Sequence, residues 1–139
     1  MLLAVQLGAQ SSAPKTDFSI TVERIGCLGR CPDYTVSILS DGSVRYIGRA
    51  YVRVEGIRRK KIRTSYVEKL REKLVNEEFF NWEENTKVCV DLPEVKISAT
   101  MGKQRKQVIE GCNLPGKVLR LADEVDKISG AREWVGTRP

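Results

Sequence analysis

Cysteine is the residue type whose spacing in this chain most directly suggests chemistry. Cys27 and Cys31 stand four positions apart, and Cys89 and Cys112 lie far along the chain. An even number of cysteines in a small chain favours disulfides, and four cysteines allow three pairings. We favour Cys27 with Cys31 and Cys89 with Cys112, because the second pair flanks a hairpin expected to turn near Gly102. That bridge would close a loop of about 24 residues and contribute roughly 3 kcal/mol in the chain-entropy model.

Two other roles of the cysteines remain open. A thiol–disulfide redox centre at Cys27 and Cys31 would use Arg30, which lies between them, to lower the pKa of one thiol. A zinc site would need four thiolates, but Cys89 and Cys112 do not form a second close pair. We therefore expect no metal and no cofactor, and we keep the redox centre as the alternative function.

Signatures of catalysis are absent from the sequence. The chain contains no histidine, the commonest general base and metal ligand. It has no glycine-rich phosphate loop, no Gly-x-Ser-x-Gly elbow and no metal-binding histidine motif. Asp33 and Asp91 stand in turn-like contexts, where an aspartate ordinarily bonds local backbone. A hydrolase that uses either aspartate is the weaker interpretation, and we expect a protein that is not an enzyme.

A basic stretch between Arg45 and Arg63 is the second candidate for function, in a chain of net charge +6. Its cations are opposed by Glu55 alone. On a strand, Arg45 and Arg49 would share one face, which Lys96 and Arg105 from other strands could join. Such a face would bind an anion, or it is simply a solvated face whose charges protect an edge strand from aggregation. The candidate ligand-binding residues are Arg30, Asp33, Tyr34, Arg45, Arg49, Arg53, Arg58, Arg59 and Lys60.

Alternating apolar residues predict the strands that would carry these groups. Strands are expected over residues 17–25, around 34–38, and over 44–54 with a bulge at Gly48. A hairpin turn at Asp41-Gly42 joins the last two, and residues 57–63 form a basic connection. An amphipathic helix over 65–79 follows, with Ser65 and Glu68 as a capping box.

The second half is shorter, with strands expected at 95–99 and 104–110. A helix then opens at Asn113 or Leu114, with Pro115 in its first turn, and Gly130 stops it. We expect Trp134 to pack back onto the core. The sequence therefore predicts an α+β fold in the order β-β-β-α-β-β-α. Its antiparallel sheet of about five strands carries both helices on one face.

The N-terminus indicates where the protein works. Met1 to Ala9 is apolar and ends in small residues, like the end of a secretory signal with cleavage after Ala9, but the basic start of such a signal is missing. Residues 1–16 are thus either a remnant of a signal peptide or a flexible arm, and 17–139 form one disulfide-stapled domain. We expect a periplasmic or secreted protein, which argues against nucleic acid as a partner. No apolar run approaches the roughly 20 residues that span a membrane.

The cysteine segment also carries a resemblance to a known family. The residues concerned are Cys27-Leu-Gly-Arg-Cys31-Pro32-Asp33-Tyr34-Thr-Val36-Ser-Ile38, Asp41-Gly42, Tyr46-x-Gly48, Cys89-x-Asp91-x-Pro93, Gly111-Cys112 and Trp134. The chain resembles a family of uncharacterised bacterial exported domains over nearly its whole length after residue 17. The resemblance implies the fold and the exported setting, and it supplies no activity. We expect a binding or structural module whose partner is an anionic ligand or an envelope protein.

Overall fold

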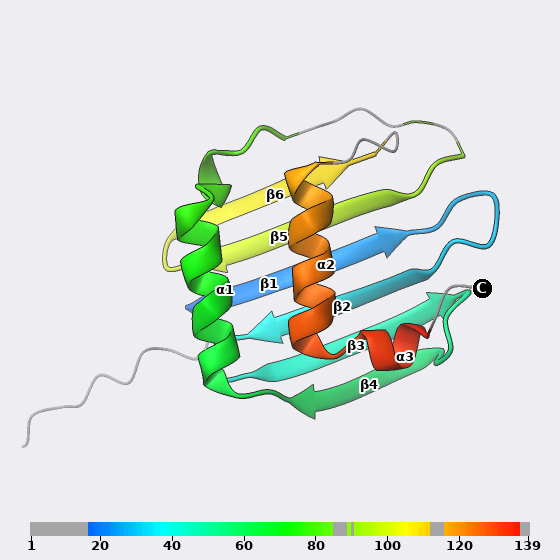
Figure 1. The fold of residues 1–139 in the computed structure, drawn as a ribbon, viewed down its shortest axis with the longest axis horizontal. Coiled ribbons are helices and arrows are strands. Elements are labelled where there is room, and N and C mark those ends of the chain that lie inside the picture. Colours follow the sequence, from blue (N-terminus) through cyan, green and yellow to red (C-terminus); the bar gives the residue numbers. More distant parts are fainter. Residues whose placement is uncertain (1–16, 85–88, 90, 112–115, 137–139) are drawn as a thin grey trace, which may run out of the picture.

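The computed structural model describes residues 17–84, 89, 91–111 and 116–136. Six strands form one antiparallel sheet in the order β4-β3-β2-β1-β5-β6 (Figure 1). The strands are β1 (Phe18–Ile25), β2 (Asp33–Leu39), β3 (Ser43–Ala50), β4 (Gly56–Lys61), β5 (Glu94–Met101) and β6 (Gln104–Glu110). The helices are α1 (Thr64–Asn76), the 3-10 turn η1 (Phe79–Asn81), α2 (Lys117–Ser129) and α3 (Arg132–Val135).

Helices α1 and α2 cross the same face of the sheet (Figure 1), so the expected α+β architecture with two helices on one face is confirmed. Apolar alternation explains this layering. In β1, Phe18, Ile20 and Val22 are fully buried under the helices, while the residues between them are half-buried on the other face. Leu70 of α1 and Leu121 of α2 belong to the same hydrophobic core. Burying one apolar face of the sheet is the main driving force for this arrangement.

The sheet has six strands rather than about five, because residues 56–61 form a strand and not a connection. Strand β3 ends at Ala50, Tyr51 adopts a positive φ of 53°, and the chain turns back to pair β4 with β3. Five of the six β4 residues are exposed, so an apolar alternation that could have revealed the strand is absent. The bulge lies beside Gly48 as expected, because the β2–β3 register makes Arg49 the extra residue.

The helix ends differ from the prediction in detail. Helix α1 begins at Thr64, and its N-cap residue Arg63 makes no side-chain capping bond, so the expected capping box is not formed. Helix α2 ends before Gly130 as predicted, and it begins at Lys117. The predicted start at 113–115 lies outside the described residues. Within the described ranges, helices are too short or too polar to cross a bilayer.

The C-terminal segment fastens the turn that leads into β4. The Trp134 ring packs 5.2 Å from the Tyr46 ring, which confirms that it folds back onto the core. The amide of Arg53 donates to the carbonyl of Val135 at 3.0 Å, and the amide of Val54 donates to the carbonyl of Trp134 at 2.8 Å. Residues 51–55 therefore have a fixed position, which in turn places β4 along β3.

Candidate functional site

A disulfide closes the loop between β1 and β2. Cys27 and Cys31 are bonded, with their Cα atoms 5.5 Å apart, which is the pairing that the sequence favours. Cys89 is also disulfide-bonded. Cys112 lies outside the described residues, so the pairing of Cys89 with Cys112 stays a prediction.

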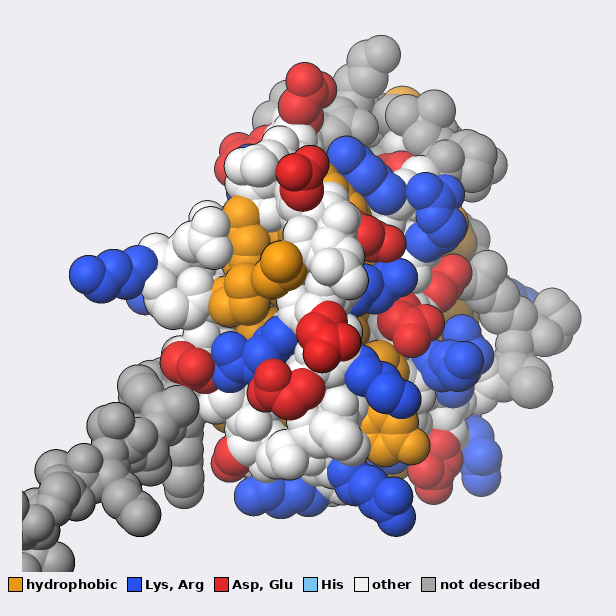
Figure 2. Space-filling model, turned by 60° about the vertical axis from the view of Figure 1, so that its left-hand side comes forward, with side chains coloured by type: hydrophobic (Ala, Val, Ile, Leu, Met, Phe, Trp, Pro, Cys, Tyr) orange, Lys and Arg blue, Asp and Glu red, His pale blue; other side chains and the backbone are white. Residues whose placement is uncertain are grey.

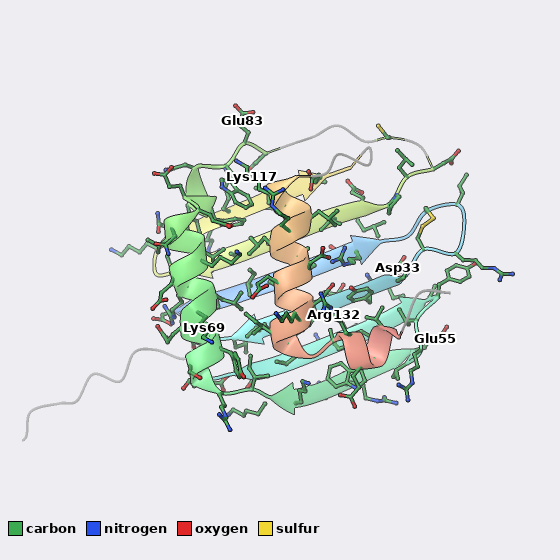
Figure 3. The ribbon with its side chains drawn as sticks, viewed as in Figure 1. Asp33, Glu55, Lys69, Glu83, Lys117 and Arg132 are labelled. Atoms are coloured by element: carbon green, nitrogen blue, oxygen red, sulfur yellow. A yellow bond between two sulfur atoms is a disulfide. The ribbon has the colours of Figure 1, made fainter. Side chains whose placement is uncertain are left out.

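Asp33 braces this loop from the face of the sheet opposite α1 and α2, which we call the open face. Figure 3 shows Asp33 at the start of β2, beside the disulfide. One of its oxygens accepts a hydrogen bond from the Gly26 amide at 3.3 Å, and the other accepts one from Arg49 Nε at 2.5 Å. Arg49 also donates to Thr35 Oγ1 at 2.8 Å. Two predicted ligand-binding residues, Asp33 and Arg49, thus bind each other and hold the loop.

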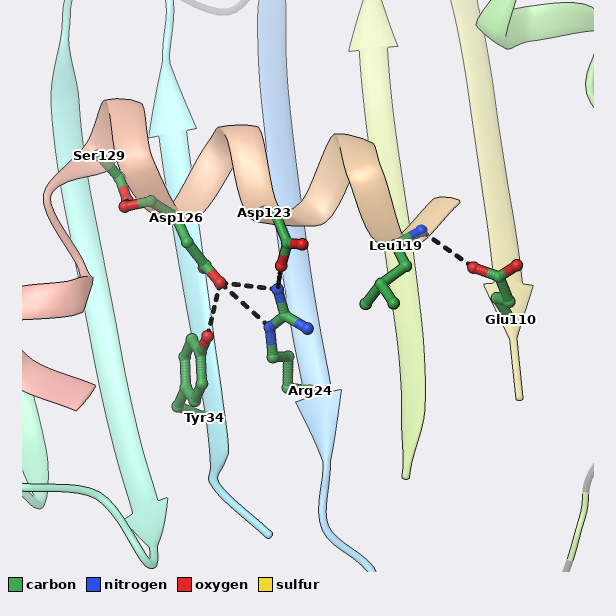
Figure 4. Close-up of polar contacts among 7 residues, drawn as sticks. All are labelled: Arg24, Tyr34, Glu110, Leu119, Asp123, Asp126 and Ser129. Atoms are coloured by element: carbon green, nitrogen blue, oxygen red, sulfur yellow. Dashed lines mark hydrogen bonds and ion pairs between the residues drawn. The ribbon is translucent and has the colours of Figure 1, made fainter. Parts of the chain in front are cut away.

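A buried polar cluster braces the same loop from the helix side. Arg24 and Tyr34 are register partners on either side of the loop, and both reach Asp126 of α2 (Figure 4). Asp126 Oδ2 accepts from Tyr34 Oη at 2.7 Å, from Arg24 Nη2 at 2.8 Å and from Arg24 Nε at 3.1 Å. Arg24 Nη2 also donates to Asp123 at 2.8 Å. Sequence reasoning missed Arg24 and Asp126, although Arg24 continues the buried alternation of Ile20 and Val22.

Burial shifts the pKa values of this cluster. It raises the pKa of Tyr34, so the hydroxyl stays a donor at neutral pH. Burial also raises the pKa of Asp126, because it outweighs the opposing charge of Arg24. For Arg24, burial acts to lower the pKa, but the negative charge of Asp126 and the bonds to both aspartates raise it overall. Arg24 is 8% exposed and Asp126 5%, so a ligand has little access and we assign the cluster to bracing.

The opposite face of the sheet has no described helix over it and carries a continuous row of polar side chains. The row runs through directly paired residues of all six strands, Arg59, Arg45, Ser37, Thr21, Ser98 and Gln107. The hydroxyls of Thr21 and Ser37 are 2.9 Å apart, and Ser98 donates to Gln107 at 3.4 Å. With strands about 4.8 Å apart, this polar row is about 24 Å long.

The predicted basic residues do not gather at one place. Arg45 and Arg59 are direct cross-strand neighbours on the open face. Arg58 and Lys60 point to the opposite side, where Lys60 lies 5.3 Å from the Trp134 ring. Arg53 belongs to the turn before β4, and Arg30 is exposed in the disulfide loop. On the side drawn in Figure 2, basic and acidic side chains are interspersed. A single basic groove formed by all of these residues is therefore absent from the described part of the chain.

A pocket of about 380 Å³ lies between the disulfide loop and the segment that leads into β5. Its lining residues are Ile25, Gly26, Cys27, Leu28, Cys89, Asp91, Leu92, Glu94 and Gly111. Asp91, which was expected to bond local backbone, has a positive φ of 72° and is exposed. Asp91 lines this pocket and Asp33 braces the loop beside it. Among the residues that the structure describes, the acidic and cysteine side chains form no group of three that could hold a metal ion.

The fold and these sites define a small two-layer α+β domain with a disulfide-held loop at one end of its sheet. The chain belongs to the family described as Domain of unknown function (DUF6438), whose model matches residues 18–129. This match confirms the expected membership of a family without an assigned activity. No curated protein matches the chain.

Proposed function

We propose that the chain is a non-enzymatic binding module of an exported protein, and that it takes an anionic ligand on the open face of its sheet. The observation that carries the proposal is the cross-strand pair Arg45 and Arg59. Like charges directly opposite each other on neighbouring strands destabilise a sheet. Within the described residues, neither guanidinium has an ion-pair partner, and both are exposed. A bound anion would offset their repulsion.

The surroundings of the pair suggest the kind of anion. The polar row continues from Arg45 through Ser37 and Thr21, whose hydroxyls donate and accept hydrogen bonds. Guanidinium groups suit sulfate, phosphate and carboxylate, which they bind through two parallel hydrogen bonds. A chain with anionic groups and hydroxyls, such as an acidic polysaccharide, matches this surface. The Cys27–Cys31 disulfide supports an exported setting, because disulfides persist in oxidising compartments.

The test compares two double variants that remove the same charge. Arg45→Gln with Arg59→Gln removes the pair on the open face, whereas Arg58→Gln with Arg120→Gln removes two exposed cations elsewhere. We expect the first variant to bind heparin, as a sulfated probe, at least tenfold more weakly in isothermal titration, since each charged hydrogen bond contributes about 1.5–3 kcal/mol. The control variant should change affinity much less. Equal losses in the two variants would show that only net charge matters and would refute the site.

One contact favours a thiol–disulfide redox protein as the second candidate. The Gly29 amide donates to Cys27 Sγ at 3.3 Å, and such a bond would stabilise a thiolate after reduction. In this function the Cys27–Cys31 disulfide accepts two electrons and two protons from a partner dithiol, which becomes a disulfide. Equilibration in glutathione buffers, followed by alkylation and intact mass, measures the potential. A value below about −300 mV marks a structural disulfide and excludes this candidate.

A further inference from the structure

The pocket beside the disulfide loop differs in its lining from the polar row. Its volume of about 380 Å³ lies at the lower end of the range of roughly 300–1,000 Å³ for small-ligand pockets. Ile25, Leu28 and Leu92 supply an apolar lining, and Asp91 and Glu94 supply two carboxylates. A pocket with an apolar lining and a few placed polar groups is the usual form of a ligand site.

The wall formed by the loop is held in place before any ligand arrives. The disulfide closes the loop, Asp33 bonds the Gly26 amide, and the cluster around Asp126 fixes the two strand ends. Despite this bracing, Leu28 at the loop tip is 84% exposed. An exposed leucine on a preorganised loop offers apolar contact without a large loss of conformational entropy on binding.

The two carboxylates give the pocket a negative charge that a cation would complement. On the open face, other acidic residues are paired with cations, as Glu23 is with Lys96 and Asp33 with Arg49. Among the described residues, Asp91 and Glu94 have no ion-pair or hydrogen-bond partner, although the chain has a net charge of +6. Glu94 is the register partner of Ile25, so one carboxylate lies directly beside the apolar lining.

We propose that this pocket binds a cation on an apolar stem, that is, an ammonium or guanidinium group with several carbon atoms behind it. The stem packs against Ile25, Leu28 and Leu92, and the cation pairs with Asp91 and Glu94. A bare calcium ion fits less well, because calcium takes six to eight oxygen ligands and gains nothing from the apolar lining. The cation comes either from a lysine or arginine side chain of a partner protein or from a free alkylamine.

The experiment is a methyl NMR titration with three six-carbon probes that differ in their head group: hexylammonium, hexanol and hexanoate. We expect hexylammonium to shift the methyl signals of Leu28 and Leu92 in a saturable way, and the other two probes to bind much more weakly. Binding of hexanol or hexanoate as tight as that of hexylammonium would overturn the proposal. Calcium chloride alone must leave these signals unchanged, and equal shifts with calcium would also overturn it.

Two double variants test whether the cation binds at the two carboxylates. Asp91→Asn with Glu94→Gln should weaken hexylammonium binding by about tenfold or more, since charged hydrogen bonds are lost. Asparagine tolerates the positive φ at position 91, so the variant keeps the local backbone. Glu72→Gln with Glu133→Gln makes the same change of charge at exposed positions of α1 and α3 and should bind normally. Unchanged binding in the first variant, with a native NMR spectrum, would refute the proposal.

A peptide titration distinguishes the two sources of the cation. If acetyl-Leu-Lys-Leu-amide binds more tightly than hexylammonium, the ligand is a side chain of a partner protein, and the reverse order assigns a free amine. Failure of both to bind would refute the site. This inference does not rest on the anion site, because Arg45→Gln with Arg59→Gln leaves the pocket lining intact and should bind both probes as the wild type does.

Discussion

Gly48 lets the Val54 carbonyl approach β3 closely, and this contact helps to position the turn before β4. Replacing Gly48 with alanine should destabilise the fold more than the addition of one methyl group suggests. Gly48 is buried in β3, and its φ is not positive. A Cβ atom there would lie 2.1 Å from the Val54 carbonyl oxygen, 2.7 Å from Tyr46 Oη and 2.9 Å from Val52 Cγ2. Since the first contact is with backbone, the strand or the following turn must move.

The expected loss of stability follows from these contacts. The Val54 carbonyl accepts a hydrogen bond from Tyr46 Oη at 2.9 Å, and displacing it loses about 1 kcal/mol. Overpacking a buried position costs about 1–3 kcal/mol more. Alanine recovers about 0.5–1 kcal/mol, because it restricts the unfolded chain. The free energy of unfolding should therefore fall by about 1–3.5 kcal/mol, and the middle of that range, near 2 kcal/mol, moves a urea midpoint by about 1 M when the slope is near 2 kcal/mol/M.

Gly102→Ala is the matched control. Gly102 has a φ of 59° in the β5–β6 turn, and an added Cβ would meet nothing within 4 Å. Its replacement should cost only about 1 kcal/mol for the left-handed backbone. Urea unfolding of both variants, followed by tryptophan fluorescence, measures the difference. If Gly48→Ala is no more destabilising than Gly102→Ala, the close contact with Val54 is not rigid and the reasoning is wrong.

Two further predictions concern the buried polar groups. Asp126→Asn keeps an oxygen that accepts hydrogen bonds from Arg24 and Tyr34. It removes a carboxylate charge that burial disfavours, because burial raises the pKa of Asp126. The free energy of unfolding at pH 7 should therefore change by less than about 1 kcal/mol. Asp126→Leu leaves the buried Arg24 with Asp123 alone and should cost about 3 kcal/mol in urea unfolding; similar costs for both variants would contradict this account. Burial raises the pKa of Tyr46 to about 12 from an ordinary value of 10.0. The stability that the protonated Tyr46 hydroxyl gives the folded state is therefore fully present below pH 10 and is lost as the pH rises through 12. Tyr46→Phe should therefore flatten the alkaline loss of stability and remove absorbance gained at 295 nm near pH 12, and an unchanged titration would disprove the assignment.

The sequence predicts those parts of the fold that local periodicity determines. Three predicted features are present in the structure: the alternation in β1, the Asp41-Gly42 turn and the buried stripe of α2. Each of them depends on residues that lie within a few positions of one another in the sequence. Strand β4 was missed because its residues alternate between two exposed sides. The cluster of Arg24 and Asp126 was missed because a bond across 102 positions leaves no local periodic pattern. The number of charges in the sequence likewise identifies the basic stretch. It does not show that Arg58 and Arg59 point to opposite faces of the sheet.

The bracing of the 26–32 loop bears on what its disulfide contributes. In the chain-entropy model, a bridge across so short a loop contributes only about 2 kcal/mol. The ends of the loop are already fixed without it, by Asp33 on one face of the sheet and by Asp126 on the other. The residues without such bracing are the exposed ones at the tip, Leu28 to Arg30. The Cys27–Cys31 bond is therefore the covalent restraint on this tip, where Leu28 lines the pocket, in addition to the roughly 2 kcal/mol that it contributes to the domain.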